Sequence, residues 1–355
     1  REVTEVNTDV PRIDHTGGGC PSLLLEPTST NYFQYSQDFN QSYWQHNADI
    51  TTTNSSELAP NGGLNANLIE YDGSGFSFIR LYMTVPSTAA TLSVFAKKGN
   101  WRYLGLRNFQ GSGNDHTVFD FDTETFSNIA SGQTASFEVF PDGWYRIKVT
   151  QPSPESNSIV GFAISNSSGS ESNTTGGQVA NVHLFGAQLE HQSYATSYIP
   201  NYGNSAGVTR AADVAGRTGD LSSVVSDDDF EIEFKFSSEN DSLFKGITFS
   251  DSTSAGGSNY VSFYLRDVKS LSTLRGVEGG SATSLVISNM PDVTVSRVYK
   301  LIRKSTYLSL EVDGTELGRI NQSFTFTNTL KYLKLTENDN AATKGVRVDY
   351  IEINN

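Results

Sequence analysis

The chain has 355 residues and a net charge of −14, with 18% charged and 11% aromatic side chains. The aromatic content excludes a disordered chain, and the abundance of Ser, Thr, Asn and Gly is typical of β-sheets joined by polar turns. The acidic balance excludes the basic surface by which nucleic-acid-binding proteins hold phosphates. No apolar run approaches the ~20 residues that span a bilayer, so we expect no membrane insertion.

Residues 1–30 are predicted to form an extended N-terminal arm. Apart from three leucines at 23–25, the segment has few large apolar side chains, and its prolines favour extended backbone. The glycines at 17–19 permit a turn with positive φ, and Cys20 is the only cysteine, so no disulfide within the chain supports the fold. We expect this arm to dock on the surface of another protein and to be held there by the leucines.

Residues 31–200 contain recurring short strand patterns separated by Gly, Asn, Ser and Pro. In TLSVFAKKG, for example, alternation places Leu92, Val94 and Ala96 on one face. Many short strands with no helical stretch between them predict an antiparallel β-sandwich, most simply a jelly roll.

Residues 201–228 are rich in Gly, Ala and Ser and have no core pattern, which predicts a linker. A second series of strands follows, and residues 229–355 are predicted to form a second β-sandwich. The segment DFEIEFKF has the clearest alternation in the chain, with expected inward-facing side chains at Phe230, Ile232, Phe234 and Phe236. Asp313-Gly314, between two alternating segments, predicts a tight hairpin.

Several ordered motifs carry a resemblance to a known group of modules. PRIDHTGGGCPSLLLEPTSTNYFQYSQDF, FAKKGNWRY, DGWYRIKVT, FGAQLE and ATSYIPNYG…VTRAADV together cover residues 9–214. This region resembles modules of tail and appendage proteins of tailed bacteriophages. The resemblance implies a carbohydrate-binding-like jelly roll at the virion surface, outside the cell.

The second half is similar to concanavalin A-like, laminin-G-type sandwiches. The similarity rests on DFEIEFKF and YKLIRKSTYLSLEVDG, which contain the strand, turn and Asp-Gly ending common in that group. It implies a second lectin-like sandwich. A fold of this kind does not by itself define a function.

The segment GNWRYLGLR contains the best candidate residues for binding sugar. Trp101 and Tyr103 would share one face of a strand, and Leu104 and Leu106 would face the core on the other side. Exposed rings stack on the C–H faces of sugars, and Arg107 could bond hydroxyl or carboxylate groups. The alternative is that the two rings pack inside the fold.

The segment FDFDTETF places Asp120, Asp122 and Glu124 on one predicted face. Such a cluster could bind calcium through oxygen ligands, or could supply the paired carboxylates of a glycosidase, although a solvated strand face is the simpler interpretation. Carbohydrate-binding jelly rolls often hold a structural ion, and this resemblance makes Glu190 in AQLE a weak candidate ligand. A structural calcium ion is the only cofactor that we expect.

The sequence lacks the motifs of nucleophilic or metal-dependent catalysis, such as G-x-S-x-G or H-E-x-x-H. We therefore interpret the chain as a non-enzymatic virion appendage protein that adsorbs to host surface polysaccharide. Its arm would contact other virion proteins, and the assembly would be a homotrimer. The alternatives are a purely structural capsid-decorating or fibre protein, and a polysaccharide lyase or glycoside hydrolase.

Overall fold

The computed structural model describes residues 3, 13–14, 22–86, 88–107, 109, 116–171, 175–213, 215–216, 229–238, 245–252, 257–265, 271–288, 290–326, 330, 332–337 and 346–354. In this part of the chain the regular structure consists of strands, apart from one 3-10 turn at Pro141–Gly143. The predicted all-β class is confirmed, and the strands pair antiparallel. None of the described segments forms a helix of the length and apolarity that crossing a membrane requires.

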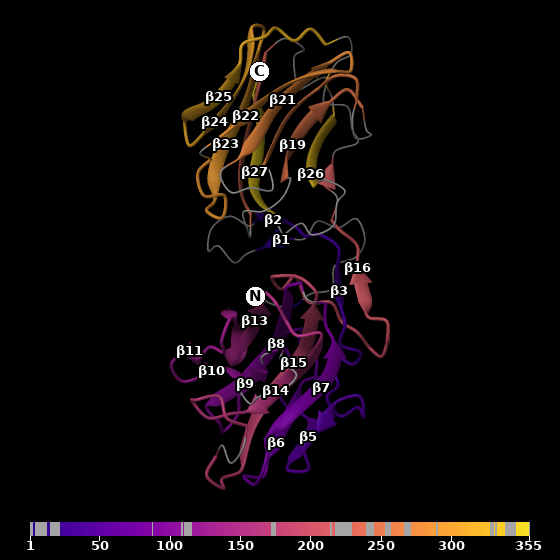
Figure 1. Cartoon of the computed structure of the whole chain (residues 1–355), viewed down its shortest axis with the longest axis vertical. Coiled ribbons are helices and arrows are strands. Elements are labelled where there is room, and N and C mark those ends of the chain that lie inside the picture. The colour runs from indigo at the N-terminus through magenta and orange to yellow at the C-terminus, as the bar shows by residue number, and fades with distance from the viewer. Residues whose placement is uncertain are drawn as a thin grey trace. The chain divides into compact units, whose positions relative to one another are not determined.

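The chain divides into two compact units. The first unit contains residues 29–210 and the first five residues, and it is a sandwich of two six-stranded sheets (Figure 1). One sheet has the order β11 (Thr125–Asn128), β10 (His116–Asp120), β9 (Tyr103–Arg107), β14 (Asn157–Ile164), β7 (Phe78–Thr84) and β4 (Gln45–His46). The other has the order β12 (Thr134–Phe140), β13 (Trp144–Gln151), β8 (Ala90–Lys98), β15 (Ala180–Glu190), β6 (Asn67–Tyr71) and β5 (Ile50–Asn54). A short ribbon joins β3 (Ser29–Asn31) to β16 (Val208–Arg210).

The second unit contains residues 6–28 and 211–355 and is also a sandwich. Its seven-stranded sheet has the order β1 (Ile13–Asp14), β2 (Ser22–Leu25), β27 (Val346–Asn354), β18 (Phe230–Ser238), β23 (Arg297–Lys304), β24 (Tyr307–Val312) and β25 (Thr315–Ile320). Its six-stranded sheet has the order β17 (Ala215–Gly216), β26 (Tyr332–Glu337), β19 (Lys245–Ser250), β20 (Tyr260–Leu265), β21 (Ser272–Glu278) and β22 (Ser281–Ile287).

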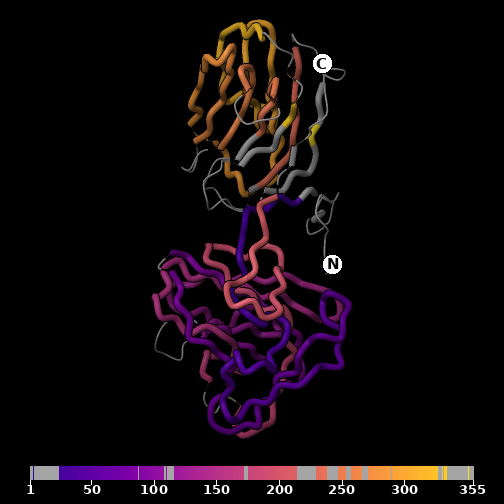
Figure 2. The backbone as a smooth tube through the Cα atoms, turned by 90° about the vertical axis from the view of Figure 1, so that its right-hand side faces the viewer, coloured from indigo at the N-terminus to yellow at the C-terminus, as the bar shows by residue number. Residues whose placement is uncertain are grey.

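The division of the chain differs from the expected one at residues 1–30 and 201–228. Part of the predicted arm is a strand of the second sandwich, because β2 pairs with β27 from Leu23 to Leu25. Part of the predicted linker also belongs to the units, because β16 pairs with β3 and β17 pairs with β26. The glycine-rich turn at 17–19, Cys20 and residues 217–228 lie outside the described residues. In Figure 2 the indigo tube of residues 22–31 can be followed from the second unit into the first.

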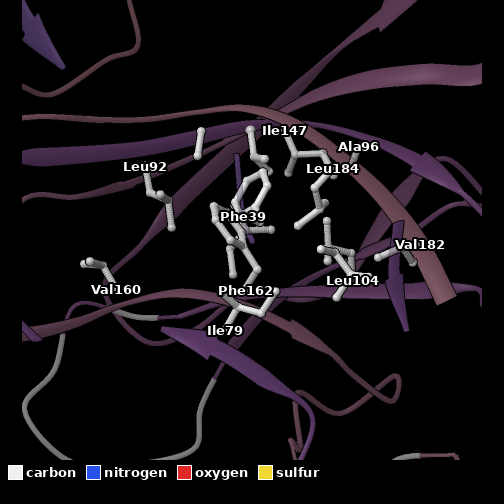
Figure 3. Close-up of a cluster of buried hydrophobic side chains, with 14 of the residues drawn as sticks. Phe39, Ile79, Leu92, Ala96, Leu104, Ile147, Val160, Phe162, Val182 and Leu184 are labelled. Carbon is white, nitrogen blue, oxygen red and sulfur yellow. The ribbon is translucent and has the colours of Figure 1, made fainter. Parts of the chain in front are cut away.

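The core of the first unit lies between its two sheets, and Figure 3 shows part of it. Leu92, Val94 and Ala96 are fully buried there, which confirms the alternation predicted for this strand. From the opposite sheet, Ile79 and Phe162 point into the same cluster (Figure 3). Burial of apolar surface stabilises the fold by about 25 cal/mol for each Å² removed from water. Because side chains alternate along a strand, the residues that face the core also determine which residues point outward.

The core of the second unit follows the predicted alternation of β18. Its four inward residues are buried, with exposed fractions of 1, 0, 2 and 4% for Phe230, Ile232, Phe234 and Phe236. The predicted hairpin joins β24 to β25, with Val312 paired to Thr315. Asp313 and Gly314 have φ of 49° and 79°, the left-handed conformation that a tight two-residue hairpin turn requires.

Candidate functional site

The outward face of β9 contains the residues predicted to contact glycan. Tyr103 is half-buried on this strand, and Trp101 lies just before it, with ring centroids 6.5 Å apart in an edge-to-face arrangement. The Trp101 Nε1 donates a hydrogen bond of 2.7 Å to the carbonyl oxygen of Ser165, and the ring packs against the core of the first unit. Trp101 therefore ties the start of the segment 165–171 to the sheet through this hydrogen bond.

Arg107 is an internal residue, so the predicted glycan contact at this position requires correction. Its exposed fraction is 3%, and its guanidinium forms an ion pair with the buried carboxylate of Glu171. The same carboxylate lies 3.2 Å from Nε2 of His116, and the His116 Nδ1 is 2.8 Å from the carbonyl oxygen of Gly169. The segment 165–171 thus covers the outward face of β9 and β10, and Arg107 anchors it.

The pKa of Glu171 reflects this environment. Burial by itself opposes the charged form, but the hydrogen bond with His116 and the positive charge of Arg107 outweigh that effect and hold the pKa below its ordinary value. The carboxylate is therefore charged at neutral pH and serves as the counter-ion of Arg107.

Asp120 ends β10 and is bound by the neighbouring Arg102. The guanidinium donates from Nε and Nη2 to the two carboxylate oxygens, each at 2.6 Å. The carboxylate also accepts bonds from the Asp122 backbone and the Thr123 hydroxyl. The bond from Arg102 is the main cause that lowers the pKa of Asp120 to about 2. Its full set of donors leaves this carboxylate poorly suited to bind a cation or to act as a general acid.

The predicted acidic face does not exist as a unit, because β10 ends at Asp120 and the following residues form a turn. Asp122 forms an ion pair of 2.5 Å with Lys98. Glu124, which has a φ of 52°, accepts a hydrogen bond of 2.9 Å from the Tyr145 hydroxyl. Across the residues that the structure describes, no three His, Cys, Asp or Glu side chains come together as a metal site would require.

Glu190, the other candidate metal ligand, is fully buried at the end of β15. Its carboxylate accepts hydrogen bonds from the hydroxyls of Ser29 at 2.5 Å and Thr196 at 2.6 Å, and from the Gln192 side chain at 3.0 Å. The Thr196 backbone N–H donates a further bond of 3.0 Å. Neutral donors from β3 and the loop after β15 thus occupy the positions that a bound ion would need.

A more open surface lies on β7, which is separated from β9 by β14 in the same sheet. Phe78, Arg80 and Tyr82 alternate outward, because Ile79 and Leu81 face the core. The carbon Cζ of the Arg80 guanidinium lies 3.9 Å from the Phe78 ring centroid and 5.2 Å from the Tyr82 ring centroid. The Tyr82 side chain is 58% exposed, so its ring is available to a ligand.

Two further residues extend this surface. Gln45 of β4 lies directly opposite Arg80 in the strand register and is exposed, and Phe76, which precedes β7, is 41% exposed. Phe76, Phe78, Arg80, Tyr82 and Gln45 are called the Arg80 face below. The alternation in FIRLYMT indicates that Phe78, Arg80 and Tyr82 share a side, but it does not distinguish a covered side from an exposed one.

Comparison with known proteins gives no family assignment. No known family profile matches the chain. No curated protein matches it in sequence.

Comparison with solved structures gives partial matches to lectin-like folds. The carbohydrate binding module CBM66 from Bacillus subtilis is 13% identical, with a TM-score of 0.29, and the match covers 37% of this chain and 78% of the module. The Caenorhabditis elegans galectin LEC-6 is 10% identical, with a TM-score of 0.31, over 40% of this chain and 91% of the galectin. Sheep galectin-11, in complex with glycerol, is 9% identical, with a TM-score of 0.27, over 40% of this chain and 97% of the galectin.

Proposed function

We propose that this chain is a glycan-binding protein and that the first sandwich binds sugar through the Arg80 face. The observation that carries the proposal is the exposed Tyr82 ring beside the Arg80 guanidinium on an outward sheet face. A sugar ring presents apolar C–H groups that stack on an aromatic face and hydroxyls that bond to arginine and amide groups. Gln45, opposite Arg80, supplies such an amide.

The proposal includes no catalytic activity. A glycosidase needs a carboxylic acid with a raised pKa and a second carboxylate across the scissile bond. Asp120 has the opposite property, since Arg102 lowers its pKa to about 2. Asp122 is paired with Lys98. These pairings favour binding over hydrolysis as the role of the sandwich.

The resemblance of residues 9–214 to phage appendage modules supports a role in adsorption at the virion surface. Host surface polysaccharide would then be the ligand, and repeated copies would raise the avidity of a weak site. Homotrimer formation and attachment to other virion proteins stay predictions. Residues 22–25 pair within the chain, so we do not assign the attachment to that part of the arm.

A glycan array probed with the full chain tests the proposal, with Tyr82→Ala as the informative variant. Tyr202→Ala is the matched control, because Tyr202 is 74% exposed but lies outside the Arg80 face. We expect the unaltered chain and Tyr202→Ala to bind the same glycans. Tyr82→Ala should lose about tenfold in affinity, the equivalent of one lost ring contact.

Release of new reducing or unsaturated ends from a bound polysaccharide would contradict the non-enzymatic proposal. Equal binding by the unaltered chain and Tyr82→Ala would remove the Arg80 face from consideration. Absence of binding at multivalent density would favour a purely structural role. Circular dichroism and thermal unfolding of each variant confirm that the sandwich is intact.

A further inference from the structure

Arg80 is a cationic side chain without an acidic partner among the described residues. Arg102, Arg107 and Lys98 of the first unit each pair with an Asp or Glu. The described contacts of the Arg80 guanidinium are with two aromatic rings, and its buried Nε has no hydrogen-bond acceptor. Although the chain has a net charge of −14, the described residues give this guanidinium two aromatic rings and no carboxylate.

The strand register places no carboxylate opposite Arg80 among the described residues. On β14 the position opposite Arg80 is Gly161, and the position opposite Tyr82 is Ile159. On β4 the opposite position is Gln45. Directly opposed side chains are ~5 Å apart, so these neutral residues define the immediate surroundings of the guanidinium.

The acid that bonds to Phe76 of this face is already engaged. Asp49 accepts hydrogen bonds from the backbone N–H of Phe76 at 3.1 Å and from the Ser74 hydroxyl at 3.5 Å. No ion pair between Asp49 and Arg80 is present among the described residues. Among the described residues the positive charge therefore has no carboxylate beside it, and it lies near the buried Phe78 ring and the exposed Tyr82 ring.

An anion is the natural partner of such a group. A guanidinium binds carboxylate or phosphate through two parallel hydrogen bonds, and these charge-assisted bonds are about twice as strong as neutral ones. The rings of Phe78 and Tyr82 orient the guanidinium and reduce its hydration. An anionic group on a sugar that stacks on Tyr82 would lie within reach of Arg80.

We infer that the Arg80 face selects saccharides that carry an anionic group, and this inference rests on the proposed function of the same face. The anion binds to the guanidinium of Arg80, the sugar ring stacks on Tyr82, and Gln45 bonds a hydroxyl. Uronic acids and sugar phosphates share this chemistry.

Titration calorimetry with the full chain tests the inference. The probes are an oligouronide, the same oligouronide after reduction of its carboxyl groups, and a sugar-phosphate oligomer of similar length. The variants are Arg80→Gln, Arg80→Lys and Tyr82→Ala. Arg275→Gln is the matched control, because Arg275 also lies over a tyrosine ring, that of Tyr260 at 5.8 Å, but in the second sandwich.

We expect an anionic oligomer to bind about tenfold more tightly than the reduced one, with the preference reduced by high salt. Arg80→Gln should remove this preference, Arg80→Lys should retain part of it, and Arg275→Gln should leave it unchanged. Whether the uronide or the phosphate is preferred identifies the anion.

Equal losses in Arg80→Gln and Arg275→Gln would overturn the inference, since they would indicate a general charge effect. Equal affinity for the oligouronide and its reduced form, with loss of both in Tyr82→Ala, would also overturn it but would leave the proposed function intact. Binding of no saccharide would refute both.

Discussion

Glu26 and Asp213 are 187 positions apart in the chain, yet they exchange two hydrogen bonds. The backbone N–H of Glu26 donates to Oδ2 of Asp213 at 2.7 Å, and the backbone N–H of Asp213 donates to the carbonyl oxygen of Glu26 at 2.8 Å. The pairing continues along the chain as the β3–β16 ribbon. Residues 26–31 and 208–213, the two segments by which the chain connects the units, are therefore paired with each other.

Asp213→Ala should lower the free energy of unfolding of the second unit by about 1 kcal/mol, because the backbone N–H of Glu26 loses its acceptor. Denaturant unfolding followed by circular dichroism measures this change. Asp38→Ala is the control, since Asp38 accepts from Asn40 and Gln41 close by in sequence. If Asp213→Ala lowers the free energy of unfolding no more than Asp38→Ala does, the long-range hydrogen bond contributes no more to stability than a local one.

Glu171→Gln should destabilise the first unit by about 3–5 kcal/mol, because it removes the buried carboxylate charge that pairs with the buried Arg107 guanidinium. The comparison is Glu316→Gln, which removes one partner of the exposed pair with Arg319 and should cost about 0–1 kcal/mol. Urea unfolding of both variants gives the two values. Similar small losses would mean that the segment 165–171 is held mainly by Trp101.

Stability should fall in acid partly through Asp120, whose pKa is lowered to about 2 in the folded state. The unfolded value is about 3.9, so the stabilisation is complete above that pH and is lost as the pH falls through 2. Asp120→Asn removes this component. The difference in unfolding midpoint between the two proteins should shrink below pH ~4, and a constant difference down to pH ~2 would contradict the assignment.

Gly161→Ala should destabilise the first unit strongly, by about 1–3 kcal/mol or more. Gly161 has a φ of 153°, and a Cβ there would collide with the carbonyl oxygen of Ile79 and the Cα of Arg80. Gly177→Ala is the control: its φ of 85° is also left-handed, but a Cβ there meets nothing within 4 Å. Both variants introduce conformational strain, but only Gly161→Ala introduces a collision. Thermal unfolding of the two variants therefore measures the effect of the collision, and equal decreases in Tm would show that the collision has no effect.

Local alternation predicted the inward faces well. Leu92 and Phe230 are buried as expected, because apolar periodicity and a two-sided strand determine which face joins the core. The hairpin at Asp313-Gly314 was equally predictable, since few residues adopt the backbone it needs. These features depend on residues close together in the sequence.

The candidate site was less predictable, because its character depends on residues far apart in the chain. Alternation placed Arg107 outward correctly, but it could not show that Glu171 and its segment cover that side. It also could not show that β4 and β14 place no acid opposite Arg80, which depends on the strand register. The pairing of Leu25 with Val346 was also not predictable from local alternation, because the two residues are far apart in the sequence.

That last pairing has a consequence for biosynthesis. β2 leaves the ribosome before the strands of the first sandwich, whereas its partner β27 follows every other described strand. The first sandwich can therefore fold during translation before β27 is available to pair with β2, and the second can close only after β27 has been made. Slow translation or truncation near residue 346 would expose the unpaired edge of β2, where aggregation begins most readily.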